Sequence, residues 1–291
     1  MTMPLDLRLN AFRDDLADIR LKGQVEAARF VEGTPARVRA PIASLRRRPA
    51  GDAPLETEAL FGEAVRVFEA GAEGWSFVQL DGDSYVGWME SEALGPVGPE
   101  PQWKVGAPRT LVFPGPDIKQ PPLMALPMGA LVVGTGEASD RNADYVTIAP
   151  YGAIVRQHLV PVTAAEADFV SVAARFLGAP YLWGGKSTLG IDCTGLVQIA
   201  CSMAGVAAPR DSDMQEAWAK VTPEDAPRER GDLIFWKGHV GIMLDEARLL
   251  HANAHHMMTA IEPLAEAVAR IGSKGVPVTS IRRVPGYVHT P

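Results

Sequence analysis

The sequence predicts an α+β protein in which two small β-barrels precede a larger C-terminal domain of helices and strands. Up to about residue 162, short strand patterns alternate with turn residues, and strands at such spacing favour small barrels. From Thr163 onward, longer helical patterns alternate with apolar, strand-like runs. The chain has 291 residues, enough for one to three domains of ordinary size.

Composition and charge exclude several classes of protein. A hydrophobic share of 47% with 22% charged residues is typical of globular domains and excludes global disorder. The net charge of −7 argues against a nucleic-acid partner, because an acidic protein repels phosphate. No apolar run approaches the ~20 residues of a membrane-spanning helix, so we expect no membrane partner.

Two features predict a cytoplasmic location. Asp14, Asp15 and Asp18 lie where a signal peptide would have its apolar core. Only two cysteines are present, Cys193 and Cys201, which is too few for a secreted disulfide scaffold.

The chain is expected to divide into four segments. Residues 1–33 form an N-terminal leader with a mixed helical pattern. Residues 34–98 form the first barrel, and residues 99–162 form the second barrel together with a proline-rich linker. Residues 163–291 form the C-terminal domain. Its first helix is predicted to begin at Thr163, because Thr163 and Glu166 have the spacing of a capping box.

Cys193 is a candidate nucleophile at the start of a second helix. Apolar residues at helical spacing follow it, and Asp192 precedes it as a candidate helix cap. A helix N-terminus has partial positive charge, which favours a thiolate, and the flanking glycines would let a substrate backbone approach. Cys201, on the same helix, is expected to be a buried structural residue.

Two histidines are candidate partners for Cys193. His239 opens an apolar run that is typical of a buried strand, and His251 follows the next such run. Adjacent strands can place the two rings side by side. Nucleophile, base and orienting group are the parts of a Cys–His hydrolase.

From Thr163 onward the chain resembles the NlpC family of cell-wall peptidases. The matching elements follow the family's order: Tyr181-x-Trp183-Gly184-Gly185, Asp192-Cys193-Thr194-Gly195, Pro209-Arg210-Asp211-Ser212-x-x-Gln215, Gly231-Asp232-Leu233-Ile234-Phe235-Trp236 and His239-Val240-Gly241-Ile242. Thr194 replaces the family's usual serine and keeps the hydroxyl. The resemblance implies a compact papain-like fold for the C-terminal domain.

The resemblance also implies roles. Cys193 would be the nucleophile, His239 the general base and then general acid, and His251 the residue that orients His239. Cleavage would pass through a thioester. The substrate pocket would be lined by five further residues: Tyr181, Asp192, Thr194, Asp211 and Ser212.

Upstream segments resemble the bacterial SH3-like barrels fused to peptidases of the YkfC type. The segments are 45–49, 56–63 and 85–88. Members of that type are γ-D-glutamyl-L-diamino acid endopeptidases acting on short murein peptides with a free N-terminal L-Ala. There an acidic residue and a tyrosine of the first barrel help to bind the free amine. Glu56 and Tyr85 are the matching positions, with Glu58 and Glu63 as rivals of Glu56.

The function expected from this resemblance is recycling of cell-wall peptides in the cytoplasm, with no metal or organic cofactor and a monomeric chain. The alternatives are an amidase or acyltransferase of the same fold, or an inert module that binds wall peptides. His255 and His256 suggest a metal site together with His251, since His251 and His255 have i, i+4 spacing, but we expect no metal because no carboxylate or thiolate nearby completes a tetrahedral set and Cys193 is already assigned as nucleophile.

Overall fold

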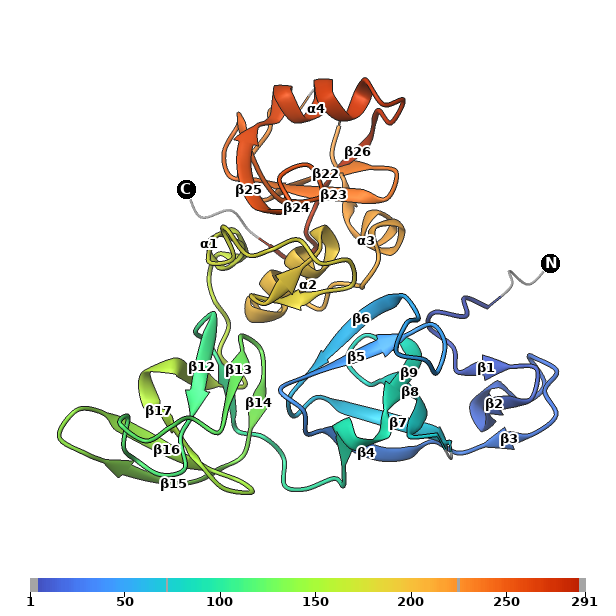
Figure 1. Cartoon of the computed structure of the whole chain (residues 1–291). Coiled ribbons are helices and arrows are strands. Elements are labelled where there is room, and N and C mark those ends of the chain that lie inside the picture. The colour runs from blue at the N-terminus through green and yellow to red at the C-terminus, as the bar shows by residue number, and fades with distance from the viewer. Residues whose placement is uncertain (1–4, 72, 224–225, 288–291) are drawn as a thin grey trace. The chain divides into compact units, whose positions relative to one another are not determined.

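The structure, a computed structural model, describes residues 5–71, 73–223 and 226–287. It divides into two compact units, one ending at Val162 and the other beginning at Thr163. Within the described residues, all four α-helices belong to the second unit (Figure 1). None of the described helices is both long and apolar enough to cross a membrane.

The N-terminal segment forms short strands where a helical pattern was predicted, so that prediction is wrong. Strands β1 to β3 form one small sheet, with a 3-10 turn, η1, after β2: β1 (Phe12–Arg13), β2 (Leu16–Asp18), η1 (Ile19–Leu21) and β3 (Phe30–Val31). Ala11 and Leu16 share a hydrophobic core with Phe68, Phe77 and Val86. The segment is therefore part of the first β-domain, and this core overrides the helical pattern.

Seven strands of the first unit form one sheet in the order β10-β4-β7-β8-β9-β5-β6. Their bounds, with the 3-10 turn η2, are β4 (Thr34–Val38), β5 (Ile42–Arg46), β6 (Leu55–Leu60), β7 (Ala64–Ala70), β8 (Trp75–Leu80), β9 (Val86–Glu90), η2 (Ser91–Ala93) and β10 (Leu94–Gly95). Alternate residues of β5, Ala43 and Leu45, are buried, as the period of a strand requires.

The rest of the first unit consists of small sheets around a core of its own, which includes Val112, Leu126 and Val146. The elements are β11 (Trp103–Val105), β12 (Arg109–Val112), β13 (Met124–Pro127), β14 (Leu131–Val132), β15 (Gly134–Ser139), β16 (Asp144–Ile148), β17 (Ala153–Val155), η3 (Arg156–His158) and β18 (Leu159–Pro161). These strands do not form one continuous sheet. That the first and the second β-domain are each a closed barrel stays a prediction.

The second unit is built on a six-stranded antiparallel sheet in the order β21-β26-β22-β23-β24-β25. Its strands are β21 (Lys220–Val221), β22 (Asp232–Trp236), β23 (His239–Met243), β24 (Arg248–Asn253), β25 (Met258–Pro263) and β26 (Val278–Arg283). A separate short hairpin pairs β19 (Lys186–Ser187) with β20 (Gly190–Ile191).

Helices cover both faces of this sheet. Helix α4 (Leu264–Gly272) buries Ala267 against Ile234, Trp236 and Leu249, while α2 (Cys193–Met203) packs on β23 and β24 from the other side (Figure 1). All five residues of β22 are buried for this reason, which explains its continuous apolar run. The remaining helices are α1 (Phe169–Ala174) and α3 (Ser212–Trp218).

Helix α1 begins six residues later than the capping box predicted. Its cap is Asp168, whose carboxylate accepts hydrogen bonds from the backbone N–H groups of Val170 (3.0 Å) and Ser171 (3.2 Å). Arg230 and the hydroxyl of Tyr287 also donate to Asp168, each at 2.7 Å. These distant partners fix the cap, and a local pattern could not reveal them.

Candidate active site

Cys193 is the first residue of α2, as predicted, and is buried. Helix α2 begins here because the carboxylate of Asp192 accepts a hydrogen bond from the N–H of Gly195 at 2.6 Å. The thiol therefore lies at the positive end of a helix of eleven residues. Cys201, further along α2, is fully buried, as expected for a structural residue.

The glycines around Cys193 serve packing within the protein. A Cβ on Gly195 would lie 2.3 Å from the carbonyl oxygen of Gly185, and one on Gly185 would lie 2.4 Å from that of Gly190. These contacts leave no space for a side chain. At these positions the glycines let the loop approach the helix, whereas the sequence suggested room for a substrate backbone.

A buried ion pair holds the start of α2. Arg210 donates from Nη1 to Oδ1 of Asp192 (3.0 Å) and from Nη2 to Oδ2 (2.7 Å), and only 1% of Arg210 is exposed. Asp192 also accepts from the N–H of Gly184 (2.8 Å) and the hydroxyl of Thr194 (2.9 Å). Burial raises the pKa of Asp192, but Arg210 outweighs it, so the pKa lies below its usual value.

Asp192 and Thr194 were predicted to contact substrate, and the structure places both in this buried network. Helix α3 joins the network through Gln215, whose Nε2 donates to the carbonyl of Thr194 at 3.0 Å. Asp211 and Ser212 stand at the start of α3 and are half-buried. Substrate contact by these four residues stays a prediction, whereas the part of Asp192 and Thr194 in holding the helix start is explicit.

The two predicted histidines meet. Strands β23 and β24 are adjacent and antiparallel, and Nε2 of His239 lies 2.8 Å from Nδ1 of His251. His251 falls within β24, where the sequence placed it just after the strand. The thiol of Cys193 lies beside the N–H of Val240, the residue after His239, and this N–H lowers the thiol's pKa. The thiol of Cys193 therefore lies against β23, the strand on which His239 stands.

Behind the histidines lies a second ion pair that sequence reasoning missed. Nε2 of His251 is 2.7 Å from Oε1 of Glu262 on β25. Arg270 on α4 donates to both oxygens of Glu262, at 2.6 Å to Oε2 and 2.5 Å to Oε1. No sequence motif marks Glu262 or Arg270, because both join the site only through the β24–β25 pairing and the packing of α4.

Burial sets the resting protonation states. It raises the pKa of Cys193 to about 12, with the charge of Asp192 adding to the effect, and it lowers the pKa of His239 to about 3 and that of His251 to about 4. Burial also raises the pKa of Glu262, but hydrogen bonds from Arg270 and His251 hold it at about 2. At neutral pH the arrangement is a thiol, two neutral imidazoles and a carboxylate, in contrast to the free thiolate that the helix end alone suggests.

Tyr181 lies near Cys193, the candidate nucleophile, and Glu56 and Tyr85 belong to the first unit. Burial and then the negative charge of Cys193 raise the pKa of Tyr181. Glu56 on β6 pairs with Arg47 at 2.6 Å, and Tyr85 is buried. A meeting of Glu56 or Tyr85 with a substrate stays a prediction.

Side chains of His251, His256 and Glu262 lie within 4.8 Å of one another, the spacing of a metal site. The sequence argument against a metal assumed that no carboxylate lies near these histidines, and Glu262 shows that this assumption was wrong. Both oxygens of Glu262, however, already accept from the Arg270 guanidinium, and a cation in that position opposes a second cation.

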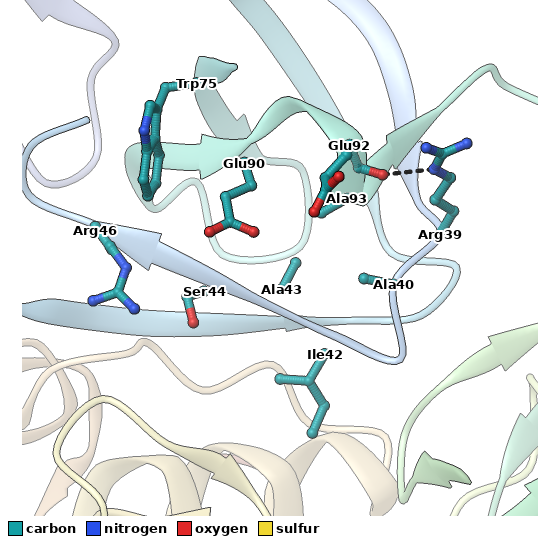
Figure 2. Close-up of a pocket in the computed structure, with 10 residues that line it drawn as sticks. All are labelled: Arg39, Ala40, Ile42, Ala43, Ser44, Arg46, Trp75, Glu90, Glu92 and Ala93. Atoms are coloured by element: carbon teal, nitrogen blue, oxygen red, sulfur yellow. Dashed lines mark hydrogen bonds between the residues drawn. The ribbon is translucent and has the colours of Figure 1, made fainter. Parts of the chain in front are cut away.

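The first unit has a cavity of about 240 Å³ above β5 (Figure 2). Its polar lining includes Arg39, Arg46, Glu90 and Glu92, with Trp75 at one end. Nε of Arg39 donates to the carbonyl of Glu92 at 2.6 Å. None of the residues predicted to contact substrate lines this cavity.

The similarities to known proteins agree with the order of the sequence motifs and with the geometry of the site. Residues 178–270 match the NlpC/P60 family, and residues 45–94 match the bacterial dipeptidyl-peptidase SH3 domain. A crystal structure of an NlpC/P60 family protein from Bacillus cereus superimposes with a TM-score of 0.72, at 21% identity, covering 86% of this chain and 99% of that one. It shows that the fold is shared.

Two curated proteins match over most of the chain. The gamma-D-glutamyl-L-lysine dipeptidyl-peptidase of Bacillus subtilis is 28% identical over 74% of this chain and 77% of its own length. Dipeptidyl-peptidase 6 of Lysinibacillus sphaericus is 27% identical over 73% of this chain and 85% of its own length. The chain therefore joins a bacterial SH3 domain to a hydrolase domain of the NlpC/P60 family of cysteine peptidases.

Proposed function

We propose that the chain hydrolyses the γ-D-Glu–diamino acid bond of short murein peptides that begin with a free L-Ala. The observation that carries the proposal is the combination, in one chain, of the Cys193–His239–His251 arrangement with similarity over 74% of the chain to a gamma-D-glutamyl-L-lysine dipeptidyl-peptidase. The diamino acid would be diaminopimelate or lysine. Wall-peptide recycling in the cytoplasm is the role that we propose for this activity.

The proposed chemistry begins with proton transfer from the thiol of Cys193 to His239. The thiolate attacks the carbonyl carbon of the γ-glutamyl bond, and the tetrahedral oxyanion is stabilised by the N–H of Cys193. This N–H belongs to the first turn of α2, where backbone donors lack partners within the helix. His239 then gives the proton to the departing amine, and water hydrolyses the thioester.

Selection of a free N-terminus requires an acceptor for a charged amine, because a buried ammonium must be paired. Strand β6 supplies two candidates, Glu56 and Glu58. Glu56 is already paired with Arg47, whereas Glu58 is buried. Glu63, the third candidate, follows β6 and accepts a hydrogen bond from the N–H of Leu60 at 3.2 Å. Glu56→Gln and Glu58→Gln are matched variants that test which carboxylate meets the amine.

The test is incubation of the purified chain with L-Ala-γ-D-Glu-meso-diaminopimelate and with its N-acetylated copy, with products identified by mass spectrometry. Release of L-Ala-γ-D-Glu from the free peptide alone supports the proposal, and Cys193→Ala should abolish it. Equal cleavage of both peptides refutes the amine pocket. Cleavage of neither refutes the proposed substrate and favours another acyl group or simple binding.

A further inference from the structure

We infer that Glu262, held by Arg270, is a positioning residue that fixes the tautomers of both active-site histidines and so makes Nδ1 of His239 the proton acceptor. The inference deepens the proposed function and rests on its assignment of Cys193 as nucleophile and His239 as base. It uses one chain of contacts, from α4 through β25 and β24 to β23.

The charged end of this series of contacts is the ion pair between Glu262 and Arg270. A carboxylate can only accept hydrogen bonds, and both oxygens of Glu262 accept from Arg270. The 2.7 Å contact between Oε1 of Glu262 and Nε2 of His251 therefore requires a proton on Nε2. Glu262 and His251 are 6% and 1% exposed, so water does not compete for this bond.

The proton on Nε2 decides the rest of the network. In a neutral imidazole the other nitrogen is bare, so Nδ1 of His251 is an acceptor. His239 presents its Nε2 to that nitrogen at 2.8 Å and must donate. With its proton on Nε2, neutral His239 has a lone pair on Nδ1. That nitrogen is the one that can take the proton from Cys193.

Arg270 opposes the uptake of a second proton by His251. Beside a carboxylate alone, His251 would gain a proton more readily, and a proton on its Nδ1 would remove the acceptor for His239. The titratable and charged groups facing His251 are Glu262, Arg270 and His256, and His239 lies against its Nδ1. Of these, Arg270 and His256 oppose the charging of His251, and Arg270 also keeps Glu262 ionised.

In the reaction, the S–H bond of Cys193 breaks and an N–H bond forms at Nδ1 of His239. The resulting imidazolium donates from Nε2 to His251, whose basicity is increased by Glu262. A histidine held in the wrong tautomer costs a Ser-His-Asp enzyme roughly 10⁴-fold in kcat. For this longer relay we expect a loss of at least about 100-fold when the acceptor at position 262 is removed.

The test compares Glu262→Met, which removes the acceptor, with Glu262→Gln, which keeps a carbonyl oxygen. Histidine side chains of the full chain are labelled with ¹⁵N, and their tautomers are determined by NMR, with signals assigned through variants that each replace one histidine. In the wild type both His239 and His251 should have the proton on Nε2. Glu262→Met should lose this state and at least about 100-fold in kcat with KM nearly unchanged. Glu262→Gln should retain the tautomers and most of the activity.

Two control variants distinguish a positioning role of Glu262 from an effect on folding and from a general effect of changing a charge. Glu266→Gln removes an exposed carboxylate from the same helix as Arg270 and should change neither tautomers nor kcat. The double variant Glu262→Met/Arg270→Met also removes the guanidinium that Glu262→Met leaves unpaired. It should lose the tautomers and kcat to the same extent as Glu262→Met. The test therefore stays valid if the single variant folds poorly. The rate of Cys193 alkylation by iodoacetamide is followed in parallel, so failure of the proposed substrate does not affect this readout.

The inference is overturned by a wild-type His251 with its proton on Nδ1. It is equally overturned if Glu262→Met keeps both Nε2 protons, or if Glu262→Gln and Glu262→Met lose activity to the same extent.

Discussion

Replacement of Arg210 by methionine should strongly destabilise the second unit. The change leaves the Asp192 carboxylate buried, where it still accepts from the N–H groups of Gly184 and Gly195 and from the hydroxyl of Thr194. It removes two charge-assisted hydrogen bonds to Asp192 and one to Thr194. Loss of one partner of a buried ion pair costs roughly 3–5 kcal/mol.

For a domain of this size, that loss corresponds to a fall of roughly 10–20 °C in the melting temperature. The assay is calorimetry and urea unfolding of the full chain, following the transition of the second unit. Arg248→Met is the matched control, since Arg248 and its partner Asp245 form an exposed ion pair, which contributes at most about 1 kcal/mol. The double variant Asp192→Asn/Arg210→Met should regain part of the loss, because no charge is left unpaired.

A result in which Arg210→Met is no more destabilising than Arg248→Met would refute the reasoning. It would mean that water reaches Asp192 and that the ion pair does not hold the start of α2. If the double variant were less stable than Arg210→Met, Asp192 would be stabilised mainly by its backbone donors.

Three further predictions concern the same unit. Burial lowers the pKa of His239 to about 3 and of His251 to about 4, so the unfolded chain binds more protons than the folded chain below about pH 6.5. Acid unfolding should therefore show stability falling as the pH drops from there to about 4, by up to roughly 1 kcal/mol per pH unit for each histidine. A curve that is flat over this range would contradict it. Gly195→Ala should destabilise the unit and abolish turnover, as its Cβ would meet the carbonyl of Gly185 at 2.3 Å; a soluble variant of wild-type melting temperature would refute this packing. Iodoacetamide treatment followed by mass spectrometry should find Cys193 modified before the fully buried Cys201, because in the proposed mechanism His239 takes the proton of Cys193 as it reacts; Cys201→Ser should retain kcat.

Local patterns were sufficient for several parts of the site. The helix start at Cys193 follows from Asp192 and the apolar spacing after it, and both are read within one helix. The pairing of His239 with His251 follows from two consecutive apolar runs, which form neighbouring antiparallel strands. In each case the residues that decide the geometry are close together in the sequence.

The parts that could not be predicted depend on distant contacts. Helix α1 begins at Phe169 because Asp168 is fixed by Arg230 and Tyr287, 62 and 119 residues away in the sequence. The N-terminal residues form strands because Leu16 is buried against Phe68 and Phe77 of the first β-domain. Tertiary packing against another part of the chain overrides a local helical periodicity.

The proposed nucleophile and the proposed base are each held by a buried carboxylate and an arginine, which suggests how a pair that is neutral at rest would react. Asp192 with Arg210 fixes the end of α2, where the N–H groups favour a thiolate. Glu262 with Arg270 fixes the opposite side, where the hydrogen bond to His251 favours an imidazolium on its neighbour. Burial disfavours a thiolate or an imidazolium that is present alone, but proton transfer from Cys193 to His239 would create both charges together. In the proposed reaction the thiolate would therefore form only at the moment of attack, and the buried thiol would stay protonated before a substrate arrives.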